Sequence, residues 1–109
     1  MADKSIADVL NEAADLVEHG WCQGHFAFDA DGHEVHWRSN DACRFCLDGA
    51  LMRVRGDGAT YALRGWVAVA LGLDAELDAI EWNDAPERTQ AEVVAALREA
   101  AAREAASHA

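Results

Sequence analysis

The chain lacks long apolar runs, has few cations and carries no complete catalytic motif. No stretch approaches the ~20 apolar residues of a membrane span, and residues 1–5 lack the apolar segment of a secretory signal. Lys and Arg number nine against 20 Asp and Glu, so the formal net charge is -11. A nucleophile elbow, a phosphate-binding glycine loop and a zincin motif are all missing. These absences predict a cytoplasmic protein without pointing to a reaction.

The acidic charge is unevenly distributed along the chain. Residues 1–37 hold one Lys against eight acids, and residues 65–109 hold three Arg against nine. Residues 38–64 are mildly basic, with five Arg against three acids: Arg38, Arg44, Arg53, Arg55 and Arg64. An acidic exterior repels phosphate, so we expect no nucleic-acid partner and favour a partner protein with a basic surface. The charge is also explained by solubility alone, and the basic residues by pairing with nearby acids. Oligomeric state does not follow from these features.

Apolar periodicity predicts a mainly α, single-domain four-helix bundle spanning 1–109, with its core in about 5–104. The helices are expected at 6–19, from Ser39–Asp41 to about 54, at 59–71, and from Asp84 or Thr89 to about 105. Ser5 is a plausible N-cap of the first helix and Gly20 a natural stop. Thr89 with Glu92 fits a capping box, as does Asp84 with Glu87. Trp82 is expected to close the core beside the last helix.

A β-hairpin is predicted between the first two helices. Residues 24–28 and 33–38 flank a turn signal at Asp31-Gly32, and apolar residues alternate with polar ones in the second segment. A lone hairpin is marginal in water. We therefore expect its apolar side chains to rest on the helices; they are Phe26, Phe28, Val35 and Trp37. The Asp29-x-Asp31-Gly32 pattern echoes a calcium loop, but Arg38 stands where the closing Glu belongs, so a turn explains it.

The sharpest chemical candidate is a zinc site built from Cys22-x-x-His25 and Cys43-x-x-Cys46. Zinc takes four N or S ligands, and a two-residue gap lets one turn supply two of them. His19, His33 and His36 lie nearby as spare ligands. The alternative is that Cys43 and Cys46 lie on the inner stripe of a helix as small apolar residues. A redox pair at a helix N-terminus is a further alternative. No other cofactor is expected.

Three motifs occur in a fixed order along the chain. They are Gly20-Trp21-Cys22-Gln23-Gly24, then Cys46-Leu47-Asp48-Gly49-Ala50-Leu51, then Trp82-Asn83-Asp84-Ala85-Pro86 with Arg88-Thr89 and Glu92-Val93. Together they resemble an uncharacterised family of small bacterial and phage proteins with a Trp-Asn-Asp signature. The resemblance covers about residues 6–102 and implies a shared domain, with no substrate, cofactor or catalytic residue. We take its structural signature to be Trp21, Cys46, Gly49, Trp82, Asn83, Asp84 and Thr89.

The leading prediction is a non-enzymatic, acidic protein-interaction module, such as a phage or mobile-element accessory protein or an inhibitor of a host protein. Its expected docking elements are the acidic face of the first helix and the connector 74–84. A small zinc-binding protein is the first alternative. The second is an enzyme with a site between the hairpin and the start of the last helix, which a buried polar cleft holding Asp84 with a histidine would support. Helix capping explains Asn83 and Asp84 without catalysis.

Overall fold

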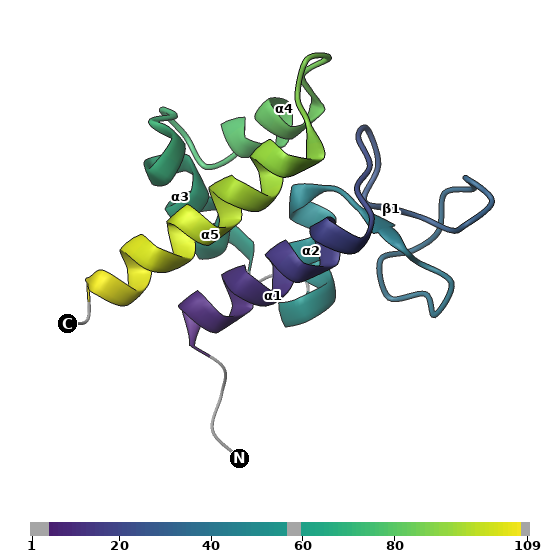
Figure 1. Ribbon diagram of the computed structural model, residues 1–109, viewed down its shortest axis with the longest axis horizontal. Coiled ribbons are helices and arrows are strands. Elements are labelled where there is room, and N and C mark those ends of the chain that lie inside the picture. Colours follow the sequence, from purple (N-terminus) through teal and green to yellow (C-terminus); the bar gives the residue numbers. More distant parts are fainter. Residues whose placement is uncertain (1–4, 57–59, 108–109) are drawn as a thin grey trace.

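Two long helices, α1 (Ile6–His19) and α5 (Gln90–Ala106), pack side by side and antiparallel as the base of the fold (Figure 1). The computed structural model describes residues 5–56 and 60–107. The helices α2 (Leu47–Arg55) and α3 (Thr60–Leu71) pack on this pair, α2 on α1 and α3 on α5. A short helix, α4 (Asp78–Asp84), contacts α2 and α3. The result is a single mainly α globule, whose described residues form five helices rather than the four of the predicted bundle.

The core lies where the apolar stripes of four helices meet. Its fully buried residues include Leu10, Leu51, Val67 and Leu97, one from each of α1, α2, α3 and α5. Alanines fill the close α1–α5 contact, where short side chains let two helices approach. Ala27, Trp37 and Phe45 extend the core into the loop region between α1 and α2. The loop region is therefore packed on the helices rather than detached from them.

Local capping signals place the two long helices as predicted. Ser5 Oγ accepts a hydrogen bond from Asp8 N at 3.0 Å and starts α1 at the expected residue. Thr89 and Glu92 form a complete capping box at the start of α5, in which Thr89 N donates to Glu92 Oε1 at 2.9 Å. The alternative start at Asp84 is wrong, because Asp84 is the last residue of α4. The predicted start of α3 at Ala59, and the break at Asp57 and Gly58, lie outside the described residues.

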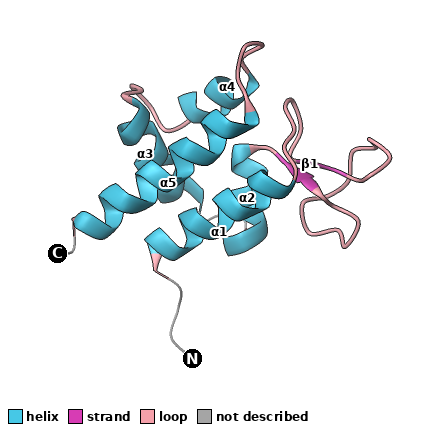
Figure 2. Cartoon of the chain, in the orientation of Figure 1, coloured by secondary structure: helices cyan, strands magenta, loops and turns pink. Residues whose placement is uncertain are grey.

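The predicted hairpin is only partly correct. A tight turn does form at 29–33, and Phe28 makes an isolated antiparallel bridge to Glu34. The two-residue strand β1 (Ala27–Phe28) nevertheless pairs antiparallel with β2 (Arg44–Phe45) (Figure 2). This partner follows the segment 33–38 that was predicted to be the second strand. Among the expected inward side chains, Trp37 is buried, whereas Phe26 is 46 % exposed.

The predicted start of α2 near Ser39–Asp41 is also wrong. Residues 39–42 form a turn, in which Ala42 N donates to Ser39 O at 3.2 Å and Ser39 Oγ accepts from Asp41 N at 3.1 Å. The helix starts after Cys46, whose Sγ accepts a hydrogen bond from Gly49 N at 3.2 Å. Strand pairing of Phe45 holds the preceding backbone extended, which excludes a helix there. Cys43 therefore lies outside any helix, and Arg44 and Arg55 do not share a helical face.

Candidate functional site

The three signature segments, distant in sequence, meet at one place in the structure. They are the turn 21–24 after α1, the start of α2 and the end of α4. Asn83, which is only 1 % exposed, joins all three. Its Oδ1 accepts from Trp21 Nε1 at 2.9 Å and from Leu47 N at 3.1 Å. Its Nδ2 donates to Cys22 O at 3.3 Å and to Asp84 Oδ1 at 2.8 Å. An amide side chain has two donors and two acceptor positions, so every one is used.

Two further contacts fix the turn 21–24 against the end of α4. Gln23 Nε2 donates to Asn83 O at 2.9 Å and to Ala85 O at 2.8 Å. Gly24 N donates to Asp84 Oδ1 at 3.0 Å. Asp84 Oδ1 thus accepts two hydrogen bonds, which hold the carboxylate in one orientation. The polar residues predicted as caps act instead as a long-range connection.

The start of α2 lies unusually close to the segment before β1. Cys46 N donates to Phe26 O at 3.2 Å. A Cβ atom at Gly49 would lie 2.0 Å from Phe26 O, so only glycine fits at this position. The missing side chain lets the backbone of Phe26 rest on α2. Gly49 therefore sets the position of Phe26, which remains about half exposed.

A cavity of about 230 Å³ opens between these fixed elements. We call it the Asp84 pocket. It lies between the turn after α1, the loop after β1, the start of α2 and the end of α4. Its lining residues are Gly24, His25, Phe26, Glu34, Cys46, Ile80 and Asp84. His25 and Asp84 both line this cavity, but both residues are exposed, so the buried polar cleft that would support the enzyme alternative is not formed here.

The electrostatics of the Asp84 pocket are acidic. His25 Nδ1 lies 3.2 Å from Glu34 Oε2, and both side chains are about half exposed. Asp84 has no Arg or Lys ion-pair partner among residues 5–56 and 60–107. The pKa of the neighbouring Cys22 rises to about 11. Burial is the main cause, and repulsion by the charge of Asp84 is the second. The pocket therefore offers an uncompensated carboxylate beside apolar walls.

The buried thiol of Cys46 is a poor nucleophile. Burial raises its pKa to about 12, and the nearby Cys22 adds to the shift. A thiol with this pKa stays protonated at neutral pH, whereas thiol chemistry requires the thiolate. Cys46 occupies the N-cap position that a redox cysteine favours, yet its burial counteracts the helix dipole. The geometry thus gives no support to a redox pair with the exposed Cys43.

The predicted zinc ligands are not drawn together as a set. Among the described residues, Asp29, Asp31 and His33 form the one group of three or more metal-binding side chains with mutually close ligand atoms. Cys22 Sγ instead lies 3.4 Å from His25 O. Cys43 points to solvent, and Cys46 caps α2. Zinc binding therefore has no preformed four-ligand centre in this structure.

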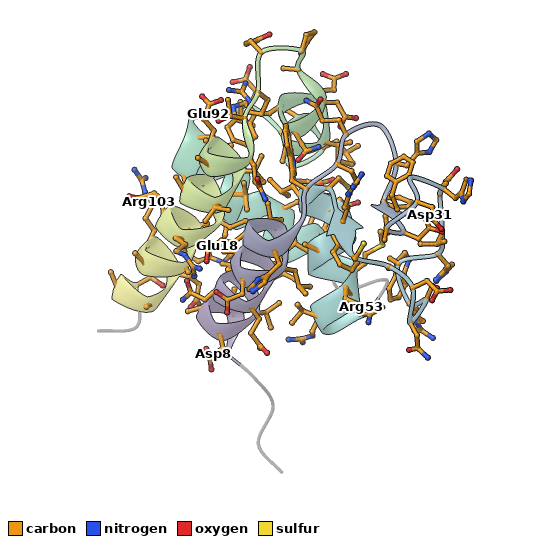
Figure 3. All side chains as sticks on the ribbon, turned by 45° about the vertical axis from the view of Figure 1, so that its right-hand side comes forward. Asp8, Glu18, Asp31, Arg53, Glu92 and Arg103 are labelled. Atoms are coloured by element: carbon orange, nitrogen blue, oxygen red, sulfur yellow. The ribbon has the colours of Figure 1, made fainter. Side chains whose placement is uncertain are left out.

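The group at Asp29 is explained by the turn it belongs to. Asp29 Oδ1 accepts from Asp31 N at 3.0 Å and from His33 N at 2.9 Å. These backbone hydrogen bonds, that of His33 first, lower the pKa of the Asp29 carboxyl. Asp31 lies at the outer edge of the loop region, away from the helices (Figure 3). The arrangement is that of a side-chain-supported turn, as the sequence indicated.

Two of the five arginines of the basic segment 38–64 are engaged in contacts within the chain. Arg53 Nη1 donates to Trp37 O at 2.9 Å and to Ser39 O at 2.7 Å, so it holds the loop region against α2. Arg64 Nη1 contacts Asp48 Oδ1 at 2.8 Å in a largely buried ion pair. Arg64 thus pairs with nearby acids, as predicted, whereas Arg53 binds backbone carbonyls instead.

Trp82 is half-buried against the core, and an arginine covers its outer face. The Arg88 guanidinium lies 4.0 Å from the ring centroid, and Arg88 Nε donates to Trp82 O at 2.8 Å. Such a cation–π contact shields an indole that the core does not enclose completely. The fully buried member of the Trp-Asn-Asp motif is thus Asn83 rather than Trp82. The sequence signal for the role of Asn83 is that the other two motifs contain hydrogen-bond donors for its side-chain oxygen, Trp21 Nε1 and Leu47 N.

Fold and site together define a small, mainly α domain whose signature residues organise a polar junction. A family of unknown function (DUF6197) matches residues 1–103, and the chain belongs to this family. The comparisons with curated proteins and with solved structures give no match. None of the helices in the described ranges combines the length and apolar character needed to cross a bilayer.

Proposed function

We propose that this chain is a small acidic protein-interaction module that docks a basic amphipathic helix of another protein along α3. The observation that carries the proposal is an apolar groove of about 440 Å³ on the outer face of α3, beside the acidic connector. Such a module suits a phage or mobile-element accessory protein, or an inhibitor that acts on a host protein. The groove, which we call the α3 groove, is lined by Tyr61, Ala62, Gly65, Ala68, Val69, Leu73, Asp74, Ala75 and Glu76.

Large apolar side chains remain exposed along this groove. Tyr61 is 70 % exposed and Val69 is 61 % exposed, and with Gly65 they follow the i, i+4, i+8 spacing of one helical face. Leu77, just beyond the groove, is also exposed. Contiguous exposed apolar surface rimmed by polar residues is typical of a protein-binding site. The spacing along α3 suits a partner that is itself helical.

Gly65 adds an independent argument for a closely approaching partner. A Cβ atom at this position would meet nothing within 4 Å. Glycine inside a helix costs about 1 kcal/mol relative to alanine, and no described neighbour compensates for that cost. A helix backbone of another protein could approach closely at this position because no side chain stands in the way. Gly65 thus differs from Gly49, where packing within the chain requires glycine.

The charge of the surroundings favours a basic partner. Asp74 lies at the rim of the α3 groove, and α4 adds Asp78 and Glu81 nearby in sequence. On α1, by contrast, Arg98 from α5 lies 2.7 Å from Asp15 and 3.9 Å from Glu18. The connector is therefore the better of the two predicted docking elements. With a net charge of -11, association with a cationic helix is favoured and self-association is opposed.

A pair of designed helical peptides tests the proposal. The two share one leucine face, and their polar faces carry either lysine or glutamate. We expect the lysine peptide to bind the wild-type chain more tightly in fluorescence anisotropy. Gly65→Leu should weaken this binding about tenfold, because the added side chain fills the α3 groove, an effect of the size of one interface hot spot. Ala102→Leu, on the exposed part of α5, is the matched control and should stay within about twofold.

Two results would refute the docking proposal. One is equal binding of the lysine and glutamate peptides. The other is unchanged binding by Gly65→Leu. Sedimentation should show a monomer, and self-association through the α3 groove would assign that face to a second copy of the chain instead. A protein captured from a cell lysate counts as a partner only if Gly65→Leu loses it and Ala102→Leu keeps it.

A further inference from the structure

The Asp84 carboxylate is a preoriented anionic group at the edge of the Asp84 pocket. Asn83 Nδ2 and Gly24 N both donate to Asp84 Oδ1, so the carboxylate is fixed before any ligand arrives. Within residues 5–56 and 60–107, no side chain or backbone donor contacts its second oxygen, Oδ2. Some acids in the fold have cationic partners, as Asp48 has Arg64 and Asp15 has Arg98, whereas Asp84 has none among the described residues. Asp84 is thus oriented but not neutralised.

The apolar side of the pocket is equally fixed. Phe26 lines the cavity, and its backbone is held against α2 by the close approach at Gly49. Ile80 adds an aliphatic surface from α4. A cation is attracted both to a carboxylate and to the face of an aromatic ring. The combination of Asp84 with Phe26 therefore favours a ligand that is positively charged at one end and apolar along its stem.

The remaining polar residues make the pocket unsuitable for anions. Glu34 contributes a second carboxylate, which lies 3.2 Å from His25 Nδ1. No Lys or Arg lines the pocket. At about 230 Å³, its volume is below the ~300–1,000 Å³ of cavities that hold drug-sized ligands. It accommodates a single charged group and a short chain rather than a nucleotide or a large cofactor.

We propose that the Asp84 pocket binds a guanidinium or primary ammonium group carried on a short alkyl chain. Asp84 supplies the charge-assisted hydrogen bond, Phe26 and Ile80 cover the stem, and Glu34 strengthens the negative potential. This chemistry is shared by an arginine or lysine side chain of a protein and by a free small amine. The site is built from elements other than α3, so it does not depend on the docking groove.

The test is a set of titrations followed by ¹H–¹⁵N NMR on the full chain. The probes are butylguanidine, butylamine, the neutral butylurea and the anionic butanoate. We expect saturable shifts of the amides of Gly24, His25 and Asp84 with the two cations. Butylurea should bind at least about tenfold more weakly, because it lacks the charge of the guanidinium. Equal binding of butylurea, or no saturable shift with either cation, would overturn the proposal.

Charge-removing variants distinguish the Asp84 pocket from general attraction to an acidic protein. Asp84→Asn keeps an oxygen acceptor for Gly24 N and removes the charge, and it should weaken butylguanidine binding about tenfold. Glu34→Gln should weaken it about threefold, as expected for a half-exposed carboxylate. Glu99→Gln makes the same charge change on the surface of α5 and should leave it unchanged. Equal weakening by all three variants would reduce the effect to net charge and refute the site.

Two further arms complete the test. If Asp84→Asn does not give the spectrum of a folded chain, Glu34→Gln and the butylurea comparison decide the outcome by themselves. A blocked Ala-Arg-Ala peptide identifies the source of the cation. Tighter binding of this peptide than of butylguanidine indicates a protein side chain, and equal or weaker binding indicates a free small amine. Both results support the cation site, whereas absence of binding by both probes rejects it.

Discussion

Asn83 Oδ1 accepts a hydrogen bond from Trp21 Nε1 at 2.9 Å, although the two residues are 62 positions apart in the chain. This contact links the end of α1 to the end of α4. Because the same oxygen also accepts from Leu47 N, one amide satisfies donors from two other segments, the turn after α1 and the start of α2. A buried polar group of this kind stabilises a fold only when all its partners are present, and here they are.

Asn83→Asp should therefore destabilise the chain strongly. The substitution removes the donor to Cys22 O and places a second carboxylate beside Asp84 in a buried position. We expect the free energy of unfolding to fall by about 2–4 kcal/mol, measured by urea denaturation at pH 7. Asn40→Asp is the control, because Asn40 is exposed, and its effect should stay below about 0.5 kcal/mol. Similar losses from both variants would contradict the role of Asn83.

The two helical glycines Gly49 and Gly65 should respond to alanine with opposite signs. At Gly49 the new Cβ would lie 2.0 Å from Phe26 O, so the backbone must shift, and we expect a loss of about 2 kcal/mol. At Gly65 the Cβ meets open space, and alanine should stabilise α3 by about 0.5–1 kcal/mol. Urea denaturation of both variants measures the two changes in the free energy of unfolding. A shift of the same sign at both positions would show that intrachain packing does not distinguish them.

Local signals explain why some elements were predictable from the sequence. Ser5 before α1 and the Thr89–Glu92 box before α5 act within four residues, so they can be identified without knowing the fold. The short helix α4 has no such signal, since Leu77 at its N-cap makes no side-chain hydrogen bond. It forms because Ala79 and Asn83 are buried against the rest of the chain. Its stability is tertiary in origin, which periodicity over seven residues does not reveal.

The pairing of β1 with β2 shows the same limit. Turn residues at 29–33 predicted a local hairpin, and that turn exists. The partner strand is decided instead by Phe45, which is buried and whose N donates to Gly20 O at 3.0 Å. Pairing across 18 positions depends on packing rather than on turn chemistry. For the candidate site, the spacing of the cysteines could not tell that Cys43 lies outside α2.

The three thiols should react in a fixed order with Ellman's reagent at pH 8. Cys43 is exposed and should react with the folded chain, whereas Cys22 and Cys46 should react only after unfolding. The reason is that burial raises the pKa of Cys22 to about 11 and that of Cys46 to about 12, so thiolate is scarce. Cys43→Ser should abolish the fast phase. Three equal rates in the folded chain would contradict the assigned burial.

Two of these thiols, Cys22 and Cys46, make the stability sensitive to alkaline pH. Folding raises the pKa of Cys46 above its ordinary value of 9.0, so the folded state favours the protonated thiol. The stabilisation is complete below about pH 9 and is lost as the pH rises toward 12. Cys46→Ser should flatten this alkaline decline in the free energy of unfolding, and Cys43→Ser should leave it unchanged. If the free energy of unfolding declines equally with alkaline pH in the wild type and in Cys46→Ser, the Cys46 thiol is not the cause of the decline.

The zinc prediction is tested separately by metal analysis of tag-free protein. A structural site would retain close to one equivalent, because apparent zinc affinities of such sites are high. Since Cys22, His25, Cys43 and Cys46 form no preformed centre, we expect less than about half an equivalent. A stoichiometric metal that is lost on replacing Cys43 would show that the loop region rearranges around the ion.

The buried ion pair of Arg64 should matter more than a surface pair of similar geometry. Arg64 joins α3 to Asp48 of α2 at 2.8 Å and to Glu76 of the connector at 2.5 Å, with all three side chains largely shielded. Arg64→Met leaves both carboxylates without their cation, and we expect a loss of about 3 kcal/mol. Arg98→Met breaks the exposed contact with Asp15 and should cost less than about 1 kcal/mol. In the double variant Asp48→Asn/Arg64→Met, part of the loss should return, because the more deeply buried charge is then absent. Comparable losses for Arg64→Met and Arg98→Met in urea denaturation would show that burial does not strengthen this network.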